Sequence, residues 1–406
     1  MPSRRDVLRL AAVAAASGLA GCTGSDFDAP ETPTGEWHTA RRDVRNTACA
    51  PEATPPESKP GRRWSRAFQT GPPVELLASA DSLYAVRANG TTVVSRDDGA
   101  WKWGTYGRDQ TPAAGLPRAA ALAPDSLYTA DGRYARAFDR DGTFRWQTAY
   151  PENSGGEARI YGVLPTGDGV LLGGHGRLSV FDSNGDYQWT FADTGGSGAT
   201  YPALAADELY VAGPGPLLSL SPRSSPESLL GRPPSTEWVS DAPGGPTWPV
   251  VTDEYVVLGD TDRAGGGRTR GNLHVYRRDG THVRSISSDG GHSHLAVASD
   301  QSAVLYGTGV FGDVEGTVTA LDLSSGETRW TREDLSVAEW GTSLVVAGDT
   351  CLFAEATDGH SARVHALDVA TGETRWVLAT ERTPEALIVA GSQVYLATAG
   401  GLVAYE

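Results

Sequence analysis

Two short segments carry side chains that could bind an anion or a metal ion. Residues 262–272 hold three consecutive glycines flanked by Arg263, Arg268 and Arg270. Backbone N–H groups of a Gly-rich loop can hold a phosphate, but a P-loop also needs a following Lys-Ser/Thr and a helix, which this segment lacks. A flexible hairpin is therefore the preferred interpretation of this segment.

The second segment is His292-Ser293-His294, which could supply two metal ligands. Two histidines without a nearby acidic or Cys partner make a weak site, so a polar loop is preferred. The sequence contains no Gly-x-Ser-x-Gly, His-Glu-x-x-His or paired Cys-x-x-Cys motif. We expect no catalytic residue and no metal. Asn89-Gly90-Thr91 fits an N-glycosylation acceptor.

The N-terminus predicts export and anchoring. Basic residues at Arg4, Arg5 and Arg9 precede a short apolar run ending in Leu-Ala-Gly-Cys22. The run is too short to span a bilayer and is typical of an export signal. The arginines resemble a twin-arginine signal and the Cys22 segment resembles a lipobox, which implies lipidation of Cys22. The alternative is a plain cleaved signal with an incidental cysteine.

This interpretation divides the chain into a signal peptide at 1–21, a flexible tether at 22–36, a lead-in segment at 37–60 and a repeat domain at 61–406. The tether is rich in Gly, Pro, Thr and acidic residues, a composition that cannot bury a core. Cys49 and Cys351 could form a disulfide outside the cytoplasm, or be two separate small hydrophobic residues.

The charge balance excludes some partners. The chain has 50 acidic and 34 basic residues, a net charge of −16, and only one methionine. Nucleic acid and anionic lipid both need Lys and Arg patches, so neither is an expected partner. Lys59 and Lys102 are the only lysines, and this acidic, Lys-poor composition resembles proteins of extreme halophiles. A GC-rich genome could also produce the arginine bias.

These candidate residues must be positioned by a repeat domain, which a recurring tryptophan marks. The recurring residues are Trp64, Trp103, Trp146, Trp189, Trp238, Trp330 and Trp376. The stride averages about 45 residues if one repeat after Trp238 has lost its tryptophan, and such a period indicates a propeller or solenoid. Each unit shows alternating apolar strands, then an Asp, a Gly turn and a short strand ending in Trp, which is typical of antiparallel hairpins.

Four strands in each unit predict an all-β, eight-bladed propeller of four-stranded antiparallel blades. First strands are expected near residues 74, 118, 160, 201, 248, 294, 343 and 385. The fifth unit lacks the Trp, and we expect Val283 or Ile286 in its packing position. The eighth unit ends after three strands, and residues 61–69 form a lone Trp strand. We expect this N-terminal strand to complete the last blade and close the ring.

The two late repeats, Ala320–Trp330 and Ala366–Trp376, resemble the PQQ-type propeller repeat A-x-D-x-x-T-G-x-x-x-W. The lead-in at Trp37 resembles entry segments of PQQ-like propellers of the BamB type. The resemblance covers nearly the whole mature chain and implies a lipoprotein that assists assembly of envelope proteins. A halophilic archaeon has no outer membrane, so that role cannot simply be transferred.

Dehydrogenases of this superfamily hold PQQ with Ca2+, an acidic base, a stacking Trp and adjacent cysteines. This chain has no Cys-Cys pair and lacks the long insertions of those enzymes. We therefore expect no PQQ and no other cofactor. A PQQ-dependent or other surface enzyme, such as a hydrolase acting in the channel, is the alternative.

The lengths of the loops predict which face of the ring binds a partner or ligand. In each unit the turn between the Asp and the Trp is short, and these turns should share one face of the ring. The loops expected on the opposite face are longer at 260–271, 308–316 and 355–362. Exposed aromatic and polar side chains there suit contact with a partner or ligand. The candidate residues of this face are Tyr201, Trp248, Arg263, Arg268, Arg270, His292, His294, Phe311, Trp340 and His360. They could instead plug the channel and pack locally.

The sequence therefore predicts a non-catalytic scaffold at the extracytoplasmic face of the cell membrane, with protein partners and a lipid anchor at Cys22. A propeller that captures a sugar or peptide at its aromatic rim is a further alternative. A small-molecule ligand is compatible with either function.

Overall fold

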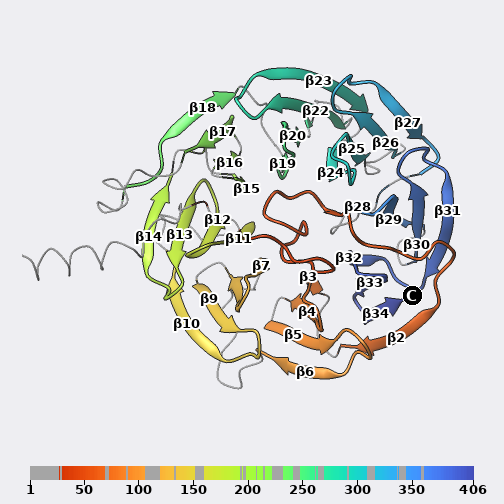
Figure 1. Ribbon diagram of the computed structural model, residues 1–406, viewed down its shortest axis with the longest axis horizontal. Helices are drawn as coiled ribbons and strands as arrows, with labels where there is room; N and C mark the ends of the chain where they lie inside the picture. Colours follow the sequence, from red (N-terminus) through yellow and green to blue (C-terminus); the bar gives the residue numbers. More distant parts are fainter. Residues whose placement is uncertain are drawn as a thin grey trace, which may run out of the picture.

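The computed structural model describes residues 27, 30–68, 73–87, 90–105, 119–131, 134–150, 160–192, 194, 198–206, 208–213, 215–221, 232–240, 247–260, 262–263, 269–289, 292–308, 316–335, 337, 344–357 and 361–406. These residues form strands, turns and bends, with no helix among them. Eight sheets stand around a central axis (Figure 1), which confirms the eight-bladed propeller. The innermost strands begin within two residues of the predicted positions.

Blades 1 to 4 each contain four antiparallel strands, numbered from the axis outward. Blade 1 contains β3 (Pro73–Ala78), β4 (Ser82–Arg87), β5 (Gly90–Ser95) and β6 (Trp101–Gly104). Blade 2 contains β7 (Ala119–Leu122), β8 (Ser126–Ala130), β9 (Tyr134–Asp139) and β10 (Phe144–Ala149). Blade 3 contains β11 (Gly162–Thr166), β12 (Gly169–Gly173), β13 (Leu178–Asp182) and β14 (Tyr187–Phe191). Blade 4 contains β15 (Tyr201–Ala205), β16 (Glu208–Ala212), β17 (Leu217–Leu220) and β18 (Thr236–Ser240).

Blades 5 to 8 vary this plan. Blade 5 contains β19 (Val250–Val251), β20 (Tyr255–Gly259), β21 (Asp262–Arg263), β22 (Thr269–Arg277) and β23 (His282–Asp289). Blade 6 contains β24 (His292–Val297), β25 (Ala303–Thr308), β26 (Val318–Asp322) and β27 (Thr328–Arg332). Blade 7 contains β28 (Leu344–Ala347), β29 (Thr350–Ala356), β30 (Ala362–Asp368) and β31 (Thr374–Thr380), with β1 (Cys49–Ala50) parallel to β28. Blade 8 contains β32 (Pro384–Ala390), β33 (Gln393–Thr398), β34 (Gly401–Tyr405) and β2 (Arg62–Ala67).

The repeat tryptophans join each blade to the next. Trp103, for example, donates its indole N–H to the carbonyl of Arg140 at 3.0 Å, in the turn of blade 2. Its ring covers the glycine of that turn, Gly142, whose φ of +94° is costly for any residue with a Cβ. The same ring-on-glycine contact joins Trp64 to Gly99, Trp146 to Gly185, Trp238 to Gly280 and Trp330 to Gly372.

Blade 5 fills the tryptophan position with Arg284, which corrects the prediction of Val283 or Ile286. The guanidinium of Arg284 covers Gly326 and donates to the carbonyl of Ser324 at 3.1 Å. It thus reproduces both contacts of the indole, a flat group on the glycine and an N–H on a turn carbonyl. Val283 and Ile286 instead pack against the core between blades 5 and 6.

The last blade draws its strands from both ends of the domain. β2 pairs antiparallel with β34, with Trp64 opposite Ala404. Because blade 8 has no turn between these two strands, Trp376 of blade 7 donates its indole N–H to the carbonyl of Pro56 at 2.7 Å instead. The lead-in segment therefore replaces a repeat turn at this junction.

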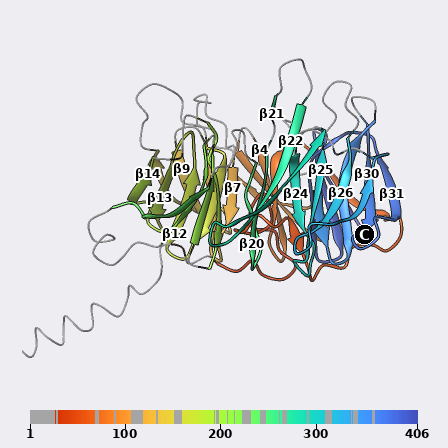
Figure 2. The same ribbon diagram turned by 90° about the horizontal axis from the view of Figure 1, so that it is seen from above.

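Residues 37–54 form a plug at one end of the central channel. Their carbonyls accept N–H groups from the ends of inner strands in five blades: His38 from Leu122, Val44 from Leu204, Arg45 from Val251, Thr47 from Val297 and Ala48 from Val346. The plug lies on the side of the short Asp-Gly turns, which we call the turn face. Figure 2 shows it along one side of the ring, with β21 and β22 rising on the opposite side, the loop face.

The composition of the predicted tether indicates a free segment. Its described part instead packs on the ring. Phe27 is 0% exposed and meets Trp189 of blade 3 edge to face, with ring centroids 6.4 Å apart. Thr32 donates to the carbonyl of Arg42 in the plug. Among the described residues, no helix has the length and apolar character needed to cross a bilayer.

Candidate functional site

Two predicted residues of the loop face lie against each other. Trp248 precedes β19 and Tyr201 begins β15, and their ring centroids are 4.9 Å apart. Tyr161, which sequence reasoning missed, meets Tyr201 edge to face at 6.0 Å. These three residues form an aromatic group across blades 3, 4 and 5, at the loop-face ends of the inner strands. All three side chains are partly exposed.

The aromatic group is held in place by close contact with blade 3. A Cβ added to Gly162 would lie 3.0 Å from the ring of Trp248 and 3.1 Å from Pro202. The glycine therefore allows the indole to lie directly on the backbone. Burial raises the pKa of Tyr201, and its neighbour Tyr161 adds to the shift. The rings are thus fixed before any partner arrives, which lowers the entropy lost on binding.

The arginine-rich segment is a hairpin, as preferred from the sequence. β21 pairs with β22 in the register Asp262 to Arg270 and Arg263 to Thr269, and β23 continues the sheet to Asp289. β21 and β22 rise beyond the ring on the loop face (Figure 2). Arg263 and Arg270 therefore lie on a strand ladder rather than in a phosphate-binding loop.

The two histidines lie in a strand, not in a polar loop. β24 begins at His292, and a bulge separates His292 from His294 in its pairing with β25. His294 is only 4% exposed, so it is not part of an exposed rim. The described residues contain no group of three or more His, Cys, Asp or Glu side chains that could hold a metal ion.

Six predicted positions lie outside the described residues. They are Cys22, Asn89, Arg268, Phe311, Trp340 and His360. Cys49 and Cys351 are both described, and both are free and buried. Burial raises the pKa of the Cys49 thiol to about 12 and also raises the pKa of Cys351. They are the two separate small hydrophobic residues that the sequence allowed, and neither thiol is activated as a nucleophile.

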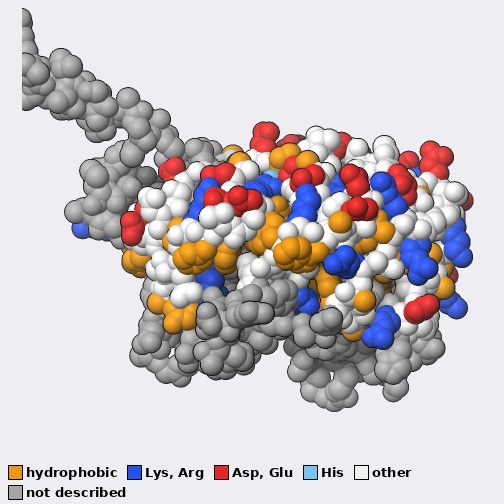
Figure 3. Space-filling model, turned by 90° about the horizontal axis from the view of Figure 1, so that it is seen from below, with side chains coloured by type: hydrophobic (Ala, Val, Ile, Leu, Met, Phe, Trp, Pro, Cys, Tyr) orange, Lys and Arg blue, Asp and Glu red, His pale blue; other side chains and the backbone are white. Residues whose placement is uncertain are grey.

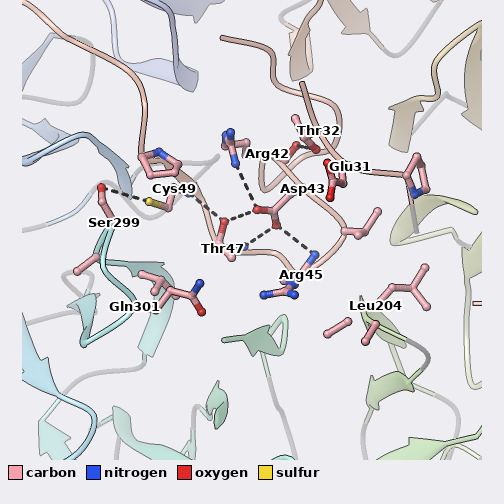
Figure 4. Close-up of a pocket in the computed structure, with 17 residues that line it drawn as sticks. Glu31, Thr32, Arg42, Asp43, Arg45, Thr47, Cys49, Leu204, Ser299 and Gln301 are labelled. Carbon is pink, nitrogen blue, oxygen red and sulfur yellow. Dashed lines mark hydrogen bonds and ion pairs between the residues drawn. The ribbon is translucent and has the colours of Figure 1, made fainter. Parts of the chain in front are cut away.

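A pocket of about 510 Å3 opens at the centre of the turn face, between the plug and blades 4 and 6. Leu204, Ala205, Val297 and Ala298 supply apolar wall, and Arg42, Arg45 and Gln301 line it from the plug and the blade 6 turn. In Figure 4 the carboxylate of Asp43 lies among the plug residues, with dashed contacts to Arg42, Arg45 and Thr47. We call this cavity the hub pocket.

The polar groups of the hub pocket largely satisfy one another. Asp43 accepts from the backbone N–H of Arg45 at 3.1 Å, from that of Thr47 at 3.0 Å, and from the Thr47 hydroxyl at 2.5 Å. Arg42 bonds Glu52 at 2.8 Å. These contacts fix the backbone of the plug, where Arg42 adopts a φ of 73°. The pocket therefore offers shape and an apolar wall, and its Arg42 and Asp43 side chains are already bonded to other plug residues.

Glu75 ties the plug to blades 1 and 2 from inside the ring. Its carboxyl is buried and accepts the backbone N–H of Ala120 at 2.6 Å and that of Ala40 in the plug. Burial raises its pKa to about 8, more than these hydrogen bonds lower it. No sequence pattern reveals this role, because the partners of Glu75 lie in separate segments of the chain.

Blade 5 also contains a chain of acid–base groups that sequence reasoning missed. His274 on β22 contacts Asp260 at 3.2 Å through Nε2 and Ser285 on β23 at 2.8 Å through Nδ1. His282 contacts the same hydroxyl at 2.9 Å. Since a carboxylate only accepts, the ring of a neutral His274 donates from Nε2, which leaves Nδ1 to accept the Ser285 hydroxyl. Burial opposes ionisation of Asp260, but hydrogen bonds from His274 and Asn272 lower its pKa overall.

His274 and Ser285 lie opposite each other on neighbouring strands, and the equivalent positions carry polar pairs in other blades. Directly opposed residues bond there in blade 2 (Arg136 to Gln147), blade 3 (Ser179 with Thr190) and blade 6 (Thr319 with Thr331). The blade 5 chain therefore occupies a structural position of the repeat. Only the register of β22 and β23 brings its members together, and their sequence spacing matches no known motif.

The outer wall carries a second set of aromatic side chains. Trp101, Phe144 and Tyr187 are 58%, 55% and 49% exposed, each two residues before the repeat tryptophan of its blade. Figure 3 shows hydrophobic side chains on this wall below an edge rich in Asp and Glu. The acidic edge is the turn face.

Comparison with known proteins places this architecture in a family. The model of the outer membrane protein assembly factor BamB family matches residues 174–406, more than half of the chain. The chain belongs to this family. The BamB match begins in blade 3 and runs to the last strand, so it covers the two specific repeats and the projecting hairpin. No curated protein matches the sequence.

Solved structures share the ring of this BamB family member at low sequence identity. A quinohemoprotein alcohol dehydrogenase from Comamonas testosteroni is 14% identical, with a TM-score of 0.67 over 92% of this chain and 80% of that one. The corresponding enzyme from Pseudomonas putida HK5 is 13% identical, with a TM-score of 0.65 over the same shares. Sqt1 of Saccharomyces cerevisiae is 11% identical, with a TM-score of 0.63 over 86% of this chain and 98% of that one. These similarities establish the fold alone.

Proposed function

We propose that this protein is a non-catalytic, lipid-anchored module of the cell envelope that binds protein partners through its loop face. The observation that carries the proposal is the aromatic group Tyr161–Tyr201–Trp248. Partly exposed, preorganised aromatic rings are the residues that most often dominate protein–protein binding energy. The projecting strands β21 and β22 lie in the neighbouring blade 5, where β21 offers a sheet edge to which an extended segment of a partner could add.

The family supports a role in protein interaction at the envelope. In this proposal Phe27 limits where the anchor can lie, because only four residues separate it from Cys22. A fully extended chain spans about 17 Å over those five steps. Phe27 packs on Trp189 beside the plug, so a lipid at Cys22 would attach near the turn face. The loop face lies on the opposite side of the ring and stays open to partners.

Export by the twin-arginine route and an acidic surface adapted to high salt complete the proposal. Both rest on the sequence: the paired arginines at Arg4 and Arg5, and a net charge of −16 with two lysines. Partner capture should therefore be done at native salt from the membrane fraction.

Capture with a matched pair of tryptophan variants tests the binding face. Trp248→Ala removes the largest ring of the aromatic group, whereas Trp101→Ala removes an exposed ring from the outer wall. We expect Trp248→Ala to lose cross-linked partners and Trp101→Ala to retain them, with the melting temperatures of both variants measured alongside. Equal recovery of partners by a folded Trp248→Ala protein would refute the proposed face.

A second candidate function, a surface hydrolase, is favoured by one observation, the exposed Ser285 hydroxyl bonded to His274, which Asp260 orients. Ser285, His274 and Asp260 would then be the nucleophile, the base and the acid that orients the base. We prefer binding because Ser285 lies on a regular strand and shares its hydroxyl with His282. The test is ester turnover by wild type and Ser285→Ala, where loss of activity in the variant would establish the hydrolase.

A quinoprotein role fits this chain poorly. The described residues offer no cluster of carboxylates for Ca2+, and its two described cysteines are separate and buried. We propose that the protein holds no PQQ. Incubation with PQQ and Ca2+, followed by gel filtration and dye reduction, checks this, and stable uptake of the cofactor would overturn it.

A further inference from the structure

Two histidines of blade 5 share one hydroxyl group. Nδ1 of His274 lies 2.8 Å from the Oγ atom of Ser285, and Nε2 of His282 lies 2.9 Å from the same atom. Imidazole nitrogens suit Zn2+, Cu2+ and Ni2+, and they bind Zn2+ at about 2.0–2.1 Å. Because both nitrogens already approach the same point, a small rotation of the exposed His282 ring is enough to place both on one ion.

A β-bulge of the repeat brings these three side chains together. The pairing of β22 with β23 skips Val283, because the register shifts at this point. Residues three apart in a regular strand point to opposite faces, but the extra residue of the bulge returns His282 and Ser285 to the same face. His274 lies directly opposite Ser285 on β22. The backbone therefore holds the two imidazoles on one side of the sheet.

Asp260 orients His274 as a metal ligand. Its carboxylate lies 3.2 Å from Nε2 of His274 and accepts the ring N–H, so the free lone pair of the neutral ring is on Nδ1, the atom that faces Ser285. Histidines that bind metals usually donate their other ring N–H to a carboxylate, which fixes the tautomer and makes the ligand more basic. Asp260 is 1% exposed and also accepts the backbone N–H of Asn272, so its position is fixed.

Blade 7 shows which part of this arrangement belongs to the repeat. His365 occupies the position on β30 that His274 occupies on β22, and its Nε2 contacts Glu355 at 2.9 Å. The residue opposite His365 is Val377, which offers no ligand. The acid–histidine pair is therefore a structural feature that two blades share. Blade 5 adds to it an exposed hydroxyl and a second imidazole.

We propose that His274 and His282 bind one divalent transition-metal ion, with Asp260 behind His274 and water in the remaining coordination positions. β23 is the outermost strand of blade 5 (Figure 1), and both His282 and Ser285 on it are exposed, so the ion reaches the site directly from solvent. Two protein ligands leave the site open, which suits an exchangeable ion rather than a structural one. This inference does not depend on the proposed partner-binding function and uses neither histidine of β24.

Titration of the full-length protein with Cu2+, followed by calorimetry, tests the site. Cu2+ is the probe because it forms the strongest complexes of the divalent first-row metals. Excess Mg2+ at constant KCl, in a buffer that does not bind copper, occupies the carboxylates of the acidic surface. We expect saturable binding and an electron paramagnetic resonance spectrum with splitting from two imidazole nitrogens. No saturable binding, or a spectrum without nitrogen splitting, would overturn the inference.

Variants locate the bound ion. His282→Gln should weaken Cu2+ binding at least about tenfold and remove one nitrogen from the spectrum, and Asp260→Asn should weaken it about 10–100-fold, as is usual when the carboxylate behind a ligand is lost. The control, His175→Gln, changes a partly exposed histidine of blade 3 and should bind as wild type does. Equal affinity of wild type and His282→Gln would contradict the proposed site. If Asp260→Asn does not fold, His282→Gln decides the matter, because it changes an exposed side chain.

Discussion

Replacing Glu75 with glutamine should change the pH dependence of stability in a predictable direction. Burial raises the pKa of the Glu75 carboxyl to about 8 in the folded protein, from an ordinary value of 4.5. The unfolded chain releases this proton near pH 4.5, whereas the folded chain keeps it up to about pH 8. The folded state therefore binds more protons between these values, and wild-type stability falls as pH rises through this window.

The size of the pKa shift of Glu75 sets the expected change in unfolding free energy. A displacement of this size corresponds to about 5 kcal/mol over the full window, of which about 2 kcal/mol falls between pH 6 and pH 8. Glutamine keeps an acceptor for the N–H groups of Ala120 and Ala40 but cannot ionise. Relative to wild type, Glu75→Gln should therefore gain about 2 kcal/mol of unfolding free energy between pH 6 and pH 8.

Denaturant unfolding of both proteins at pH 6, 7 and 8 and fixed salt measures this difference. The difference between variant and wild type cancels the titration of the many surface carboxylates. Glu381→Gln, which changes an exposed acid in the connection between β31 and β32, is the control and should show no pH-dependent difference. A difference between Glu75→Gln and wild type that stays constant from pH 6 to pH 8 would show that Glu75 is not held protonated by burial.

Three further predictions concern the repeat, the thiols and the anchor. Gly280→Ala should destabilise the ring by about 2 kcal/mol, because φ is positive and the new Cβ would lie 2.6 Å from the Trp238 ring; Gly61→Ala, with 3.9 Å of space, should not, and equal losses in chemical denaturation would contradict this. Cys49 and Cys351 should react with a thiol reagent only after unfolding, and fast labelling of the native protein would show that they are not buried. Cys22→Ser should release the protein into the medium, where blotting detects it, and retention in the membrane fraction would argue against lipidation.

The sequence predicted the ring because the repeat uses short-range chemistry. Asp, Gly and Trp recur at fixed spacing, since each turn needs a residue that tolerates positive φ and each junction needs a flat group to cover it. This pattern gave the number of blades, the start of each inner strand and the pairing of β2 with β34. It also gave the proximity of Tyr201 and Trp248 in outline, because both enter equivalent strands of neighbouring blades.

Only the tertiary structure decided the contacts that depend on register or on distant segments. Arg284 fills the missing tryptophan position because its reach suits the turn of blade 6, which no hydrophobicity pattern reveals. The chain Asp260–His274–Ser285 exists only because β22 and β23 pair in one register. Glu75 acquires its raised pKa from a ring and a plug that bury its carboxyl between them. Burial of this carboxyl depends on segments that are far apart in the sequence, so it is set by the whole fold rather than by any local segment.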